Sequence, residues 1–201
     1  MSLKQYNLSG LASIHSGVTF RGKVEDDPEG DASVIQLRNV AADFSGLQSM
    51  PCRAKSSSFR SHNFLREGDL LFVAKGKNNF CLPYKKEYGR AVAVSFFFVI
   101  RPLEEMRGAF DPLYLNWYIN SQQAQRQLKK GKEGTLTINI NKKSLGDLIV
   151  KLPPLKQQKT IAKINELKTR ENQLLKTIQK KREQLISHQL LTFINSHKST
   201  T

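Results

Sequence analysis

The C-terminal part of the chain is a long segment that lacks helix-breaking residues. Residues 156–195 contain neither glycine nor proline. Their apolar side chains recur at spacings of three, seven, four and seven residues, at Ile164, Leu167, Leu174, Ile178 and Leu185. These spacings match the a and d positions of a heptad repeat, with Glu171, Lys181 and His188 as polar interruptions.

A helix of this length cannot be stable alone. Roughly 38 residues at 1.5 Å per residue reach about 57 Å, which exceeds the width of a small domain. Most of such a helix has no domain of its own to pack against. The sequence therefore predicts a helix that pairs with another helix through the five apolar residues of the repeat.

A proline pair precedes this segment. Pro153 and Pro154 cannot continue a helix and stiffen the connection, so they mark a domain boundary. The chain has 201 residues, enough for one ordinary globular core and an extension outside it. We expect a globular domain at 1–152, a coiled-coil dimerisation and spacer helix at 153–197, and a disordered tail at 198–201.

The N-terminal half has the pattern of short strands. Apolar segments rich in Val, Ile, Leu and Phe predict strands at 33–40, 69–74 and 91–100, separated by polar loops. The acidic segment 25–31 is typical of a solvated turn, because no compact set of metal ligands follows it. We expect the strands to form a twisted mixed β-sheet.

Helical signals follow the strands. Asp111 and Pro112 have the residue types of an N-cap and a first helical position, and they predict a helix over 112–130 that ends at Gly131. A second, short helix is expected over 142–147. The expected fold class is therefore α+β, with one globular domain, a twisted mixed sheet and flanking helices, followed by one long coiled-coil α-helix.

The chain is strongly basic. Its formal net charge is +15 and its pI is about 9.9, so it attracts polyanions such as nucleic acid or an anionic membrane surface. Residues 155–201 carry 10 basic and 3 acidic side chains, against 22 and 14 in residues 1–154. The longest apolar stretch, 91–100, is too short to span a membrane. We expect a nucleic-acid partner and no membrane.

No catalytic, cofactor or metal constellation is apparent. Cys52 and Cys81 are isolated and lack metal-ligand spacing, which is typical of packing residues in a cytoplasmic protein. The tetrapeptide Asp111-Pro112-Leu113-Tyr114 lacks the second proline of the amino-methyltransferase motif. Glu166-Leu167-Lys168 has the form of a nuclease motif but lies inside the heptad segment. We expect a non-catalytic protein without cofactor or metal.

Five segments with recognisable motifs follow one another along the chain. They are LSGLASIHSGVTF (8–20), VIQLRNV (34–40), LREGDLLFVAKGKNN (65–79), YLNWYINSQQAQRQLKK (114–130) and GTLTININKKSLGDLIVKLPPLKQQKTIAKI (134–164). The fourth contains an Asn-Ser break, and the fifth ends in a Leu-Pro-Pro-Leu hinge and a Gln-Lys-x-Ile helix start. In this order, and with a heptad helix after the last, they resemble the DNA specificity subunits of type I restriction-modification systems.

The resemblance implies a half-subunit. Full specificity subunits of this family carry two recognition domains and two long helices that pair antiparallel, whereas this chain carries one of each. Methyltransferase (M) and restriction (R) activities come from separate subunits in the family. The resemblance thus implies an antiparallel homodimer on double-stranded DNA that directs M and R subunits to a bipartite target. A two-fold dimer implies an interrupted palindrome, with the coil setting the gap.

Reading DNA requires donors and acceptors that reach base edges, commonly Arg to guanine and Asn or Gln to adenine, whereas Lys and Arg on phosphate position the domain. Loops that combine these residue types are the candidates, above all 75–79, which follows a predicted strand. The DNA-binding candidates are Arg38, Asn39, Arg53, Lys55, Lys75, Lys77, Asn78, Asn79, Lys85, Lys86, Lys129, Lys130 and Lys132.

Three alternatives stay open on sequence alone. The chain fits the specificity module of another restriction-modification type, a basic RNA-binding coiled-coil protein, or a reader that pairs with a different half-subunit. Against RNA, the aromatic run at 96–98 lies in a segment too apolar to form an exposed stacking platform.

Overall fold

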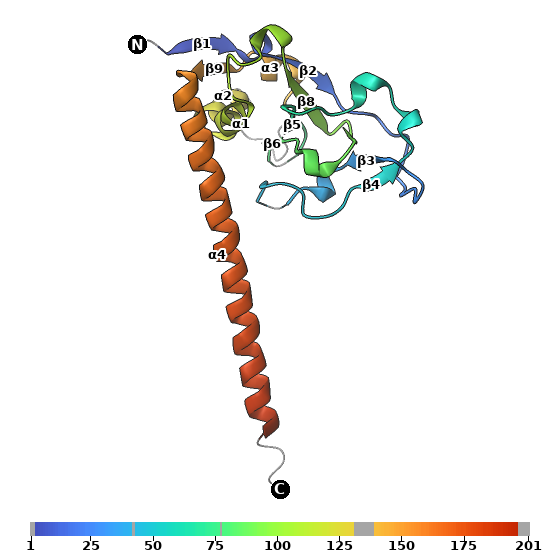
Figure 1. The fold of residues 1–201 in the computed structure, drawn as a ribbon, viewed down its shortest axis with the longest axis vertical. Coiled ribbons are helices and arrows are strands. Elements are labelled where there is room, and N and C mark those ends of the chain that lie inside the picture. The colour runs from blue at the N-terminus through green and yellow to red at the C-terminus, as the bar shows by residue number, and fades with distance from the viewer. Residues whose placement is uncertain (1–2, 42, 77, 131–138, 197–201) are drawn as a thin grey trace. The chain divides into compact units, whose positions relative to one another are not determined.

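The structure of the protein is a computed structural model that describes residues 3–41, 43–76, 78–130 and 139–196. The chain divides into two compact units, residues 1–162 and 163–201. The predicted α+β class is confirmed: short strands and helices form the first unit, and a long helix runs to the end of the described chain (Figure 1). The tail predicted at 198–201 lies outside the described residues.

The centre of the first unit is a four-stranded antiparallel sheet in the order β2-β8-β5-β6. Its strands are β2 (Ala12–Ser16), β5 (Leu70–Val73), β6 (Cys81–Pro83) and β8 (Phe97–Pro102). Leu70 and Phe72 of β5 pack into one apolar core. Leu71 and Val73 pack into a second core, on the other face. Both faces of β5 are therefore buried, which is why its sequence is a continuous apolar run without alternation.

Helices border the first core. They are α1 (Pro112–Asn120), α2 (Gln122–Lys129) and α3 (Lys142–Gly146). Asp111 caps α1 as predicted. The helix predicted over 112–130 is divided in two at the Asn-Ser break, because Ser121 is extended, with φ −66° and ψ 151°. Its hydroxyl accepts a hydrogen bond from the backbone N–H of Ala124, at 3.3 Å, and so begins α2.

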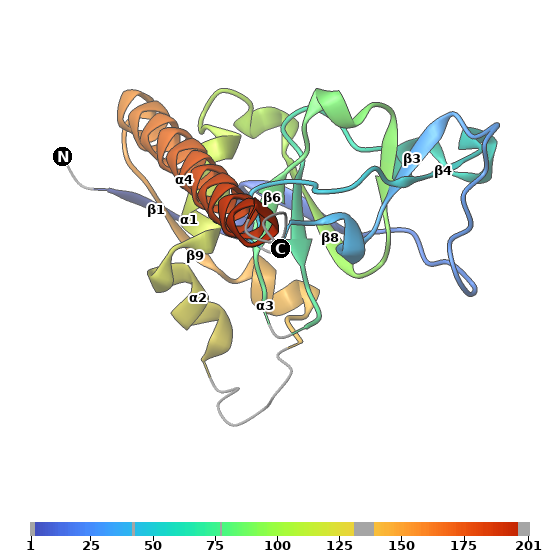
Figure 2. The ribbon, with the colours of Figure 1, turned by 90° about the horizontal axis from the view of Figure 1, so that it is seen from below.

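A three-stranded mixed sheet borders the second core. Its strands are β3 (Ala32–Ile35), β4 (Cys52–Ala54) and β7 (Ala91–Ala93). β3 pairs antiparallel with β4 and parallel with β7. Figure 2 shows β3 and β4 on one side of the central strands β6 and β8, with α1 and α2 on the other side. The strands expected in one sheet are thus divided between two sheets. The helices pack into the first core, and residues of both sheets form the second core.

Two predicted strands were too long. The strand predicted over 33–40 ends at Ile35, and Leu37–Asn39 form a 3-10 turn. The strand predicted over 91–100 is divided into β7 and β8, which belong to different sheets.

The segment that follows β2 explains why the strand predicted over 91–100 is divided. The backbone N–H of Val18 donates to the carbonyl of Ala93 at 2.8 Å, just where β7 ends. Beside it, Gly17 passes so close that a Cβ would lie 2.3 Å from the carbonyl oxygen of Val94. Only glycine fits this crossing.

The two ends of the first unit lie together. β1 (Lys4–Asn7) pairs antiparallel with β9 (Ile149–Leu152), and the chain then passes through the proline pair into α4 (Leu155–Ser196). The predicted long helix is confirmed. Its first turns belong to the globular unit, because Gln158 is 1% exposed and Ala162 is also buried.

The second unit is the rest of α4. The five apolar residues predicted for helix pairing are all exposed, by 50% to 61%. Such exposure along one face leaves that face available for a partner. No helix among the described residues is long and apolar enough to cross a membrane.

Candidate nucleic-acid interface

The turn between β5 and β6 contains the strongest sequence candidates. Lys75 and Asn78 are exposed, whereas Asn79 is 5% exposed and its side-chain amide donates to the carbonyl of Val73 at 3.0 Å. Asn79 therefore closes the hairpin, and Lys75 and Asn78 project from it. Lys77 lies outside the described residues.

Two long-range contacts hold this turn in place. The backbone N–H of Ile140 donates to the carbonyl of Ala74, at 2.9 Å. Asn120, at the end of α1, accepts from the N–H of Cys81 at 2.8 Å and donates to its carbonyl at 2.7 Å. The turn thus begins and ends on fixed backbone, which suits a loop that must present Lys75 in a defined position.

Further cations surround the chain segment that joins α2 to α3. Lys129 and Lys130 are exposed at the end of α2, and Lys132 lies outside the described residues. Lys142 and Lys143 are exposed in the first turn of α3. Sequence reasoning did not select these last two, although they lie directly after the segment that contacts Ala74.

The loop that contains Arg38 and Asn39 is held together by the asparagine. Asn39 is 3% exposed, and its amide nitrogen donates to the Ser49 hydroxyl at 3.1 Å and to the Met50 carbonyl at 3.2 Å. Its amide oxygen accepts from the backbone N–H of Gln36 at 2.8 Å. These bonds occupy Asn39 inside the loop, whereas the side chain of Arg38 is exposed.

The acidic segment 25–31 braces β4 and the residues directly after it. Arg53 of β4 and Lys55, which follows the strand, are both exposed. The carboxylate of Asp26 accepts from the backbone N–H of Arg53 at 2.7 Å. The carboxylate of Asp31 accepts from the backbone N–H of Ser56 at 2.6 Å and from its hydroxyl at 2.7 Å. These bonds from Ser56 lower the pKa of Asp31. The carboxylates here bind backbone and hydroxyl groups, which is a structural role.

Lys85 and Lys86 differ from the other candidates because acidic side chains pair with them. The ammonium of Lys86 lies 2.7 Å from the carboxylate of Glu67, and that of Lys85 lies 3.4 Å from the carboxylate of Glu87. The hydrogen bond with Glu67 raises the pKa of Lys86. Both pairs are exposed, and in each pair the carboxylate competes with any phosphate for the lysine.

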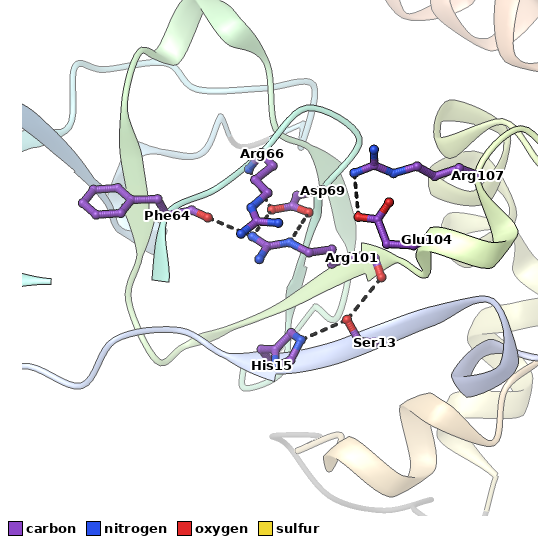
Figure 3. Close-up of polar contacts among 8 residues, drawn as sticks. All are labelled: Ser13, His15, Phe64, Arg66, Asp69, Arg101, Glu104 and Arg107. Atoms are coloured by element: carbon purple, nitrogen blue, oxygen red, sulfur yellow. Dashed lines mark hydrogen bonds and ion pairs between the residues drawn. The ribbon is translucent and has the colours of Figure 1, made fainter. Parts of the chain in front are cut away.

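A buried ion pair supports the loop that leads into β5. Figure 3 shows the Arg101 side chain of β8 meeting the carboxylate of Asp69. Its Nη2 lies 2.6 Å from Asp69 Oδ2 and its Nε lies 2.9 Å from Oδ1, while Nη2 also donates to the Phe64 carbonyl at 2.8 Å. The hydrogen bonds to Asp69 raise the pKa of Arg101.

This ion pair was not apparent from sequence. Asp69 is part of the Gly-Asp motif, but its partner lies 32 positions away, on another strand. Because the pair also holds the Phe64 carbonyl, it fixes the end of the loop that contains His62 and Arg66. The backbone N–H of Arg66 donates to Asp69 Oδ2 at 2.8 Å.

His15 of β2 lies next to this support and is surrounded by positive charge. Its ring Nε2 is 2.9 Å from the Ser13 hydroxyl, which in turn donates to the Arg101 carbonyl at 3.3 Å (Figure 3). Partial burial lowers the pKa of His15, and the positive charges of Lys142 and Arg101 lower it further. The charges of Lys142 of α3 and Arg101 of β8 thus both act on His15 of β2.

The chemistry of these loops is that of anion binding. The described residues contain no group of three or more histidine, cysteine, aspartate or glutamate side chains that could hold a metal ion. Cys81 is buried, and its burial raises the pKa of the thiol. Exposed lysine and arginine side chains on braced loops, together with an exposed asparagine, are the groups that bind phosphates and base edges. A basic globular unit with such loops has the chemistry of a nucleic-acid-binding domain.

The chain belongs to the type I restriction modification DNA specificity domain family, whose sequence profile matches residues 3–186. No curated protein matches the chain. It is therefore a DNA specificity domain, as the sequence motifs predicted. In this family, recognition is the function of the specificity component, and catalysis belongs to other subunits.

Solved structures share the fold. The HsdS subunit from Thermoanaerobacter tengcongensis is 17% identical, with a TM-score of 0.61 over 86% of this chain and 43% of that chain. A structure that describes complex assembly and conformational transition of the type I R-M system is 17% identical, with a TM-score of 0.63 over 87% of this chain and 44% of that chain. The type I S subunit from M. genitalium is 14% identical, with a TM-score of 0.53 over 81% and 38%. The chain thus spans less than half the length of each of these proteins.

Proposed function

We propose that the protein is the DNA-reading subunit of a type I restriction-modification system and works as an antiparallel homodimer. In this proposal, residues 1–152 read DNA, and the helical segment 153–197 joins two copies and spaces them. M subunits and the R subunit supply the chemistry. Two observations carry the proposal. The family profile matches residues 3–186, and the five apolar residues of the heptad repeat, which form the seam of α4, are exposed.

The proposed two-copy assembly determines the symmetry of the DNA target. A two-fold dimer presents identical readers in opposite directions, so the target consists of inverted half-sites separated by a gap.

The reading surface that we propose consists of exposed basic side chains and Asn78. Lys85 and Lys86 are left out because their ammonium groups pair with carboxylates. Asn39 and Asn79 are not part of it, because their amides serve the backbone of their own loops. Asn78 has the chemistry to read a base edge, and the lysines have the chemistry to hold phosphate. The proposed DNA contacts are Arg38, Arg53, Lys55, Lys75, Asn78, Lys129, Lys130, Lys142 and Lys143.

A second apolar stripe on α4 suits a partner of another kind. Ile186, Leu190, Phe193 and Ile194 are 55% to 64% exposed and recur at the spacing of one helix face. In the heptad repeat, Ile186 and Phe193 occupy b positions, Leu190 an f position and Ile194 a c position. These positions lie on the side of the helix opposite the a and d seam. A helix that buries only its seam in a dimer leaves this stripe exposed. We propose that an M subunit covers it.

Selection from randomised DNA tests the proposed function. The purified protein is incubated with double-stranded DNA of random sequence, and bound fragments are sequenced, with a parallel light-scattering measurement of mass. We expect inverted half-sites at a constant gap and a mass twice the chain mass of 22.8 kDa. Asymmetric half-sites would contradict a two-fold homodimer. Equal displacement by unrelated RNA, with no enriched DNA sequence, would contradict the proposal.

A further inference from the structure

The seam of α4 contains two opposite charges among its aliphatic residues. Glu171 occupies an a position and Lys181 a d position, ten residues further along. Both side chains are exposed, and neither forms an ion pair within the described helix. A charge at a seam position weakens a coiled coil unless its partner satisfies it, and such positions commonly specify register and orientation.

The orientation of the pair decides what each charge meets. In a parallel pair in register, Glu171 faces the partner's Glu171, and Lys181 faces the partner's Lys181. Both contacts are repulsive. In an antiparallel pair, each a position faces a d position of the partner subunit, so Glu171 can face the partner's Lys181, and the two-fold axis repeats the contact.

The register that brings these charges together also matches the apolar residues. The chains run in opposite directions, so moving forward along one helix means moving backward along the other. When Glu171 faces the partner's Lys181, Leu174 faces the partner's Ile178. On the other side, Leu167 faces the partner's Leu185. The aliphatic layers thus fall opposite one another on both sides of each charge pair.

Neighbouring registers lose this match. A slide of one heptad in one direction sets Glu171 against the partner's Leu174 and buries Lys181 against an isoleucine. A slide in the other direction sets Glu171 against the partner's His188, but Lys181 then faces the partner's Ile178. Each alternative desolvates a charge without an opposite charge beside it, which costs free energy.

The same register places Leu175 beside the two-fold axis. Leu175 is an e position and is 57% exposed in the single chain. In an antiparallel pair, e positions flank the seam and face one another. The matching register sets Leu175 against the partner's Leu175, which adds an apolar contact at the centre. The centre also lies near the middle of α4 (Leu155–Ser196), so the helices overlap along nearly their whole length.

The start of α4 is compatible with this pairing. Gln158 and Ala162 face the globular unit and Ile161 packs against its core, and none of them is a seam position. The seam positions of the same turns, Gln157 and Thr160, are exposed. The domain and a partner helix therefore use different faces of these turns.

We infer that Glu171 and the partner's Lys181 form two symmetry-related interhelical ion pairs that set the register of the antiparallel helix pair. The inference rests on the proposed homodimer. Its consequence is that these residues fix the gap between the half-sites. A slide of one heptad moves one reader about 10 Å along the other helix, or roughly three base pairs of DNA.

Charge reversal tests the ion pairs. E171K and K181E are each expected to raise the dimer dissociation constant at least about tenfold, because each sets two like-charged pairs in the seam. The double variant E171K/K181E restores opposite charges and is expected to return within about threefold of the original protein. Sedimentation equilibrium measures all four proteins. A double variant as weak as the singles, or weaker, would overturn the assigned pairing.

Cross-linking tests the register independently. L175C is expected to form a disulfide-linked dimer under mild oxidation, since it meets its own copy near the axis. L167C, which faces the partner's Leu185, and L190C, on the opposite face, are the matched controls and should not link. A dimeric L175C protein that stays unlinked would refute the register and leave the homodimer standing. A monomeric original protein would instead refute the proposed homodimer.

Discussion

The guanidinium of Arg101 on β8 binds the carboxylate of Asp69, which directly precedes the buried strand β5, through two hydrogen bonds of 2.6 Å and 2.9 Å. The side chains are 17% and 1% exposed. Through its further bond to the Phe64 carbonyl, Arg101 also ties down the preceding loop. The Gly-Asp motif of this sequence is therefore a structural element that positions a loop beside the candidate DNA-binding surface.

Breaking this pair should destabilise the domain strongly. Asp69→Ala leaves the Arg101 charge largely buried without a partner, and we expect a loss of about 3 kcal/mol or more in the free energy of unfolding. Urea denaturation at fixed protein concentration measures it. Glu67→Gln, which breaks the exposed pair with Lys86, is the control and should change the midpoint little. Equal effects of the two substitutions would contradict the structural role.

The docking of the first turns of α4 on the globular unit should depend on Gln158. Its side chain accepts from the Asp111 N–H at 2.9 Å and donates to the Pro153 carbonyl at 2.7 Å, while it is 1% exposed. Gln158→Ala removes both bonds, and we expect a loss of about 1 to 3 kcal/mol in the free energy of unfolding. Lys159→Ala, at the exposed neighbouring position, is the control. Unchanged stability in Gln158→Ala would show that the helix is docked by other contacts.

The β5–β6 turn should contact phosphate through Lys75. We expect Lys75→Ala to weaken binding to cognate and unrelated DNA alike, and to reduce the slope of log affinity against log salt by about one. Fluorescence anisotropy over a salt series measures both quantities. The matched control is Lys86→Ala, whose ammonium is paired with Glu67. If Lys86→Ala reduced the slope and Lys75→Ala did not, the proposed surface would be on the wrong loops.

Acid should destabilise the domain through His15. The pKa of His15 in the folded protein lies below its usual 6.5, because burial and the positive charges of Lys142, Arg101 and His62 oppose protonation more than Asp69 favours it. The unfolded chain therefore binds the proton more readily. The contribution of His15 to the free energy of unfolding is fully present above pH 6.5. It is lost as the pH falls through the pKa that His15 has in the folded protein.

Substitution separates this effect from general acid denaturation. We expect His15→Gln to show a smaller loss of stability between pH 7.5 and pH 5 than the original protein, measured by urea midpoints at each pH. His188→Gln is the control, because its side chain is exposed on α4. Identical pH profiles for His15→Gln and the original protein would contradict the assignment.

The two apolar faces of α4 should bind different partners, one face a second copy of the protein and the other an M subunit. We expect Leu174→Ser, in the seam, to convert the dimer to a monomer, and Leu190→Ser, on the opposite stripe, to leave the dimer intact. By contrast, Leu190→Ser should weaken binding of an M subunit by about tenfold or more, because it removes an apolar side chain from the surface that the M subunit covers. Light scattering and a pull-down with the M subunit measure the two effects. Loss of the dimer in Leu190→Ser would show that the seam was misassigned.

Local signals predicted the parts of the fold that depend on local physics. The long helix followed from a segment free of glycine and proline, and the start of α1 followed from Asp111 and Pro112, because both depend on residues within a few positions. The break in the strand at 91–100 could not be predicted this way. It depends on Gly17 and Val18, which meet β7 only in the folded chain.

The candidate site, too, could be predicted from the sequence only in part. Exposed lysine and arginine side chains on loops were found from residue type and loop position. Asn39 and Asn79 have the same residue chemistry as Asn78 but are buried by backbone partners that only the folded loops bring near. Lys142 and Lys143, which lie in the helix predicted over 142–147, were not among the sequence candidates, although Lys129 and Lys130 of the other predicted helix were.

Methylation mapping tests the central claim most directly. The protein is co-expressed with the M subunit of its own system, and methylated adenines are located by sequencing the host DNA. We predict methylation at a single interrupted palindrome whose inverted half-sites are separated by a constant gap. Methylation at an asymmetric bipartite site, or a methylation pattern that does not change when this protein is omitted, would contradict a homodimeric DNA-reading subunit.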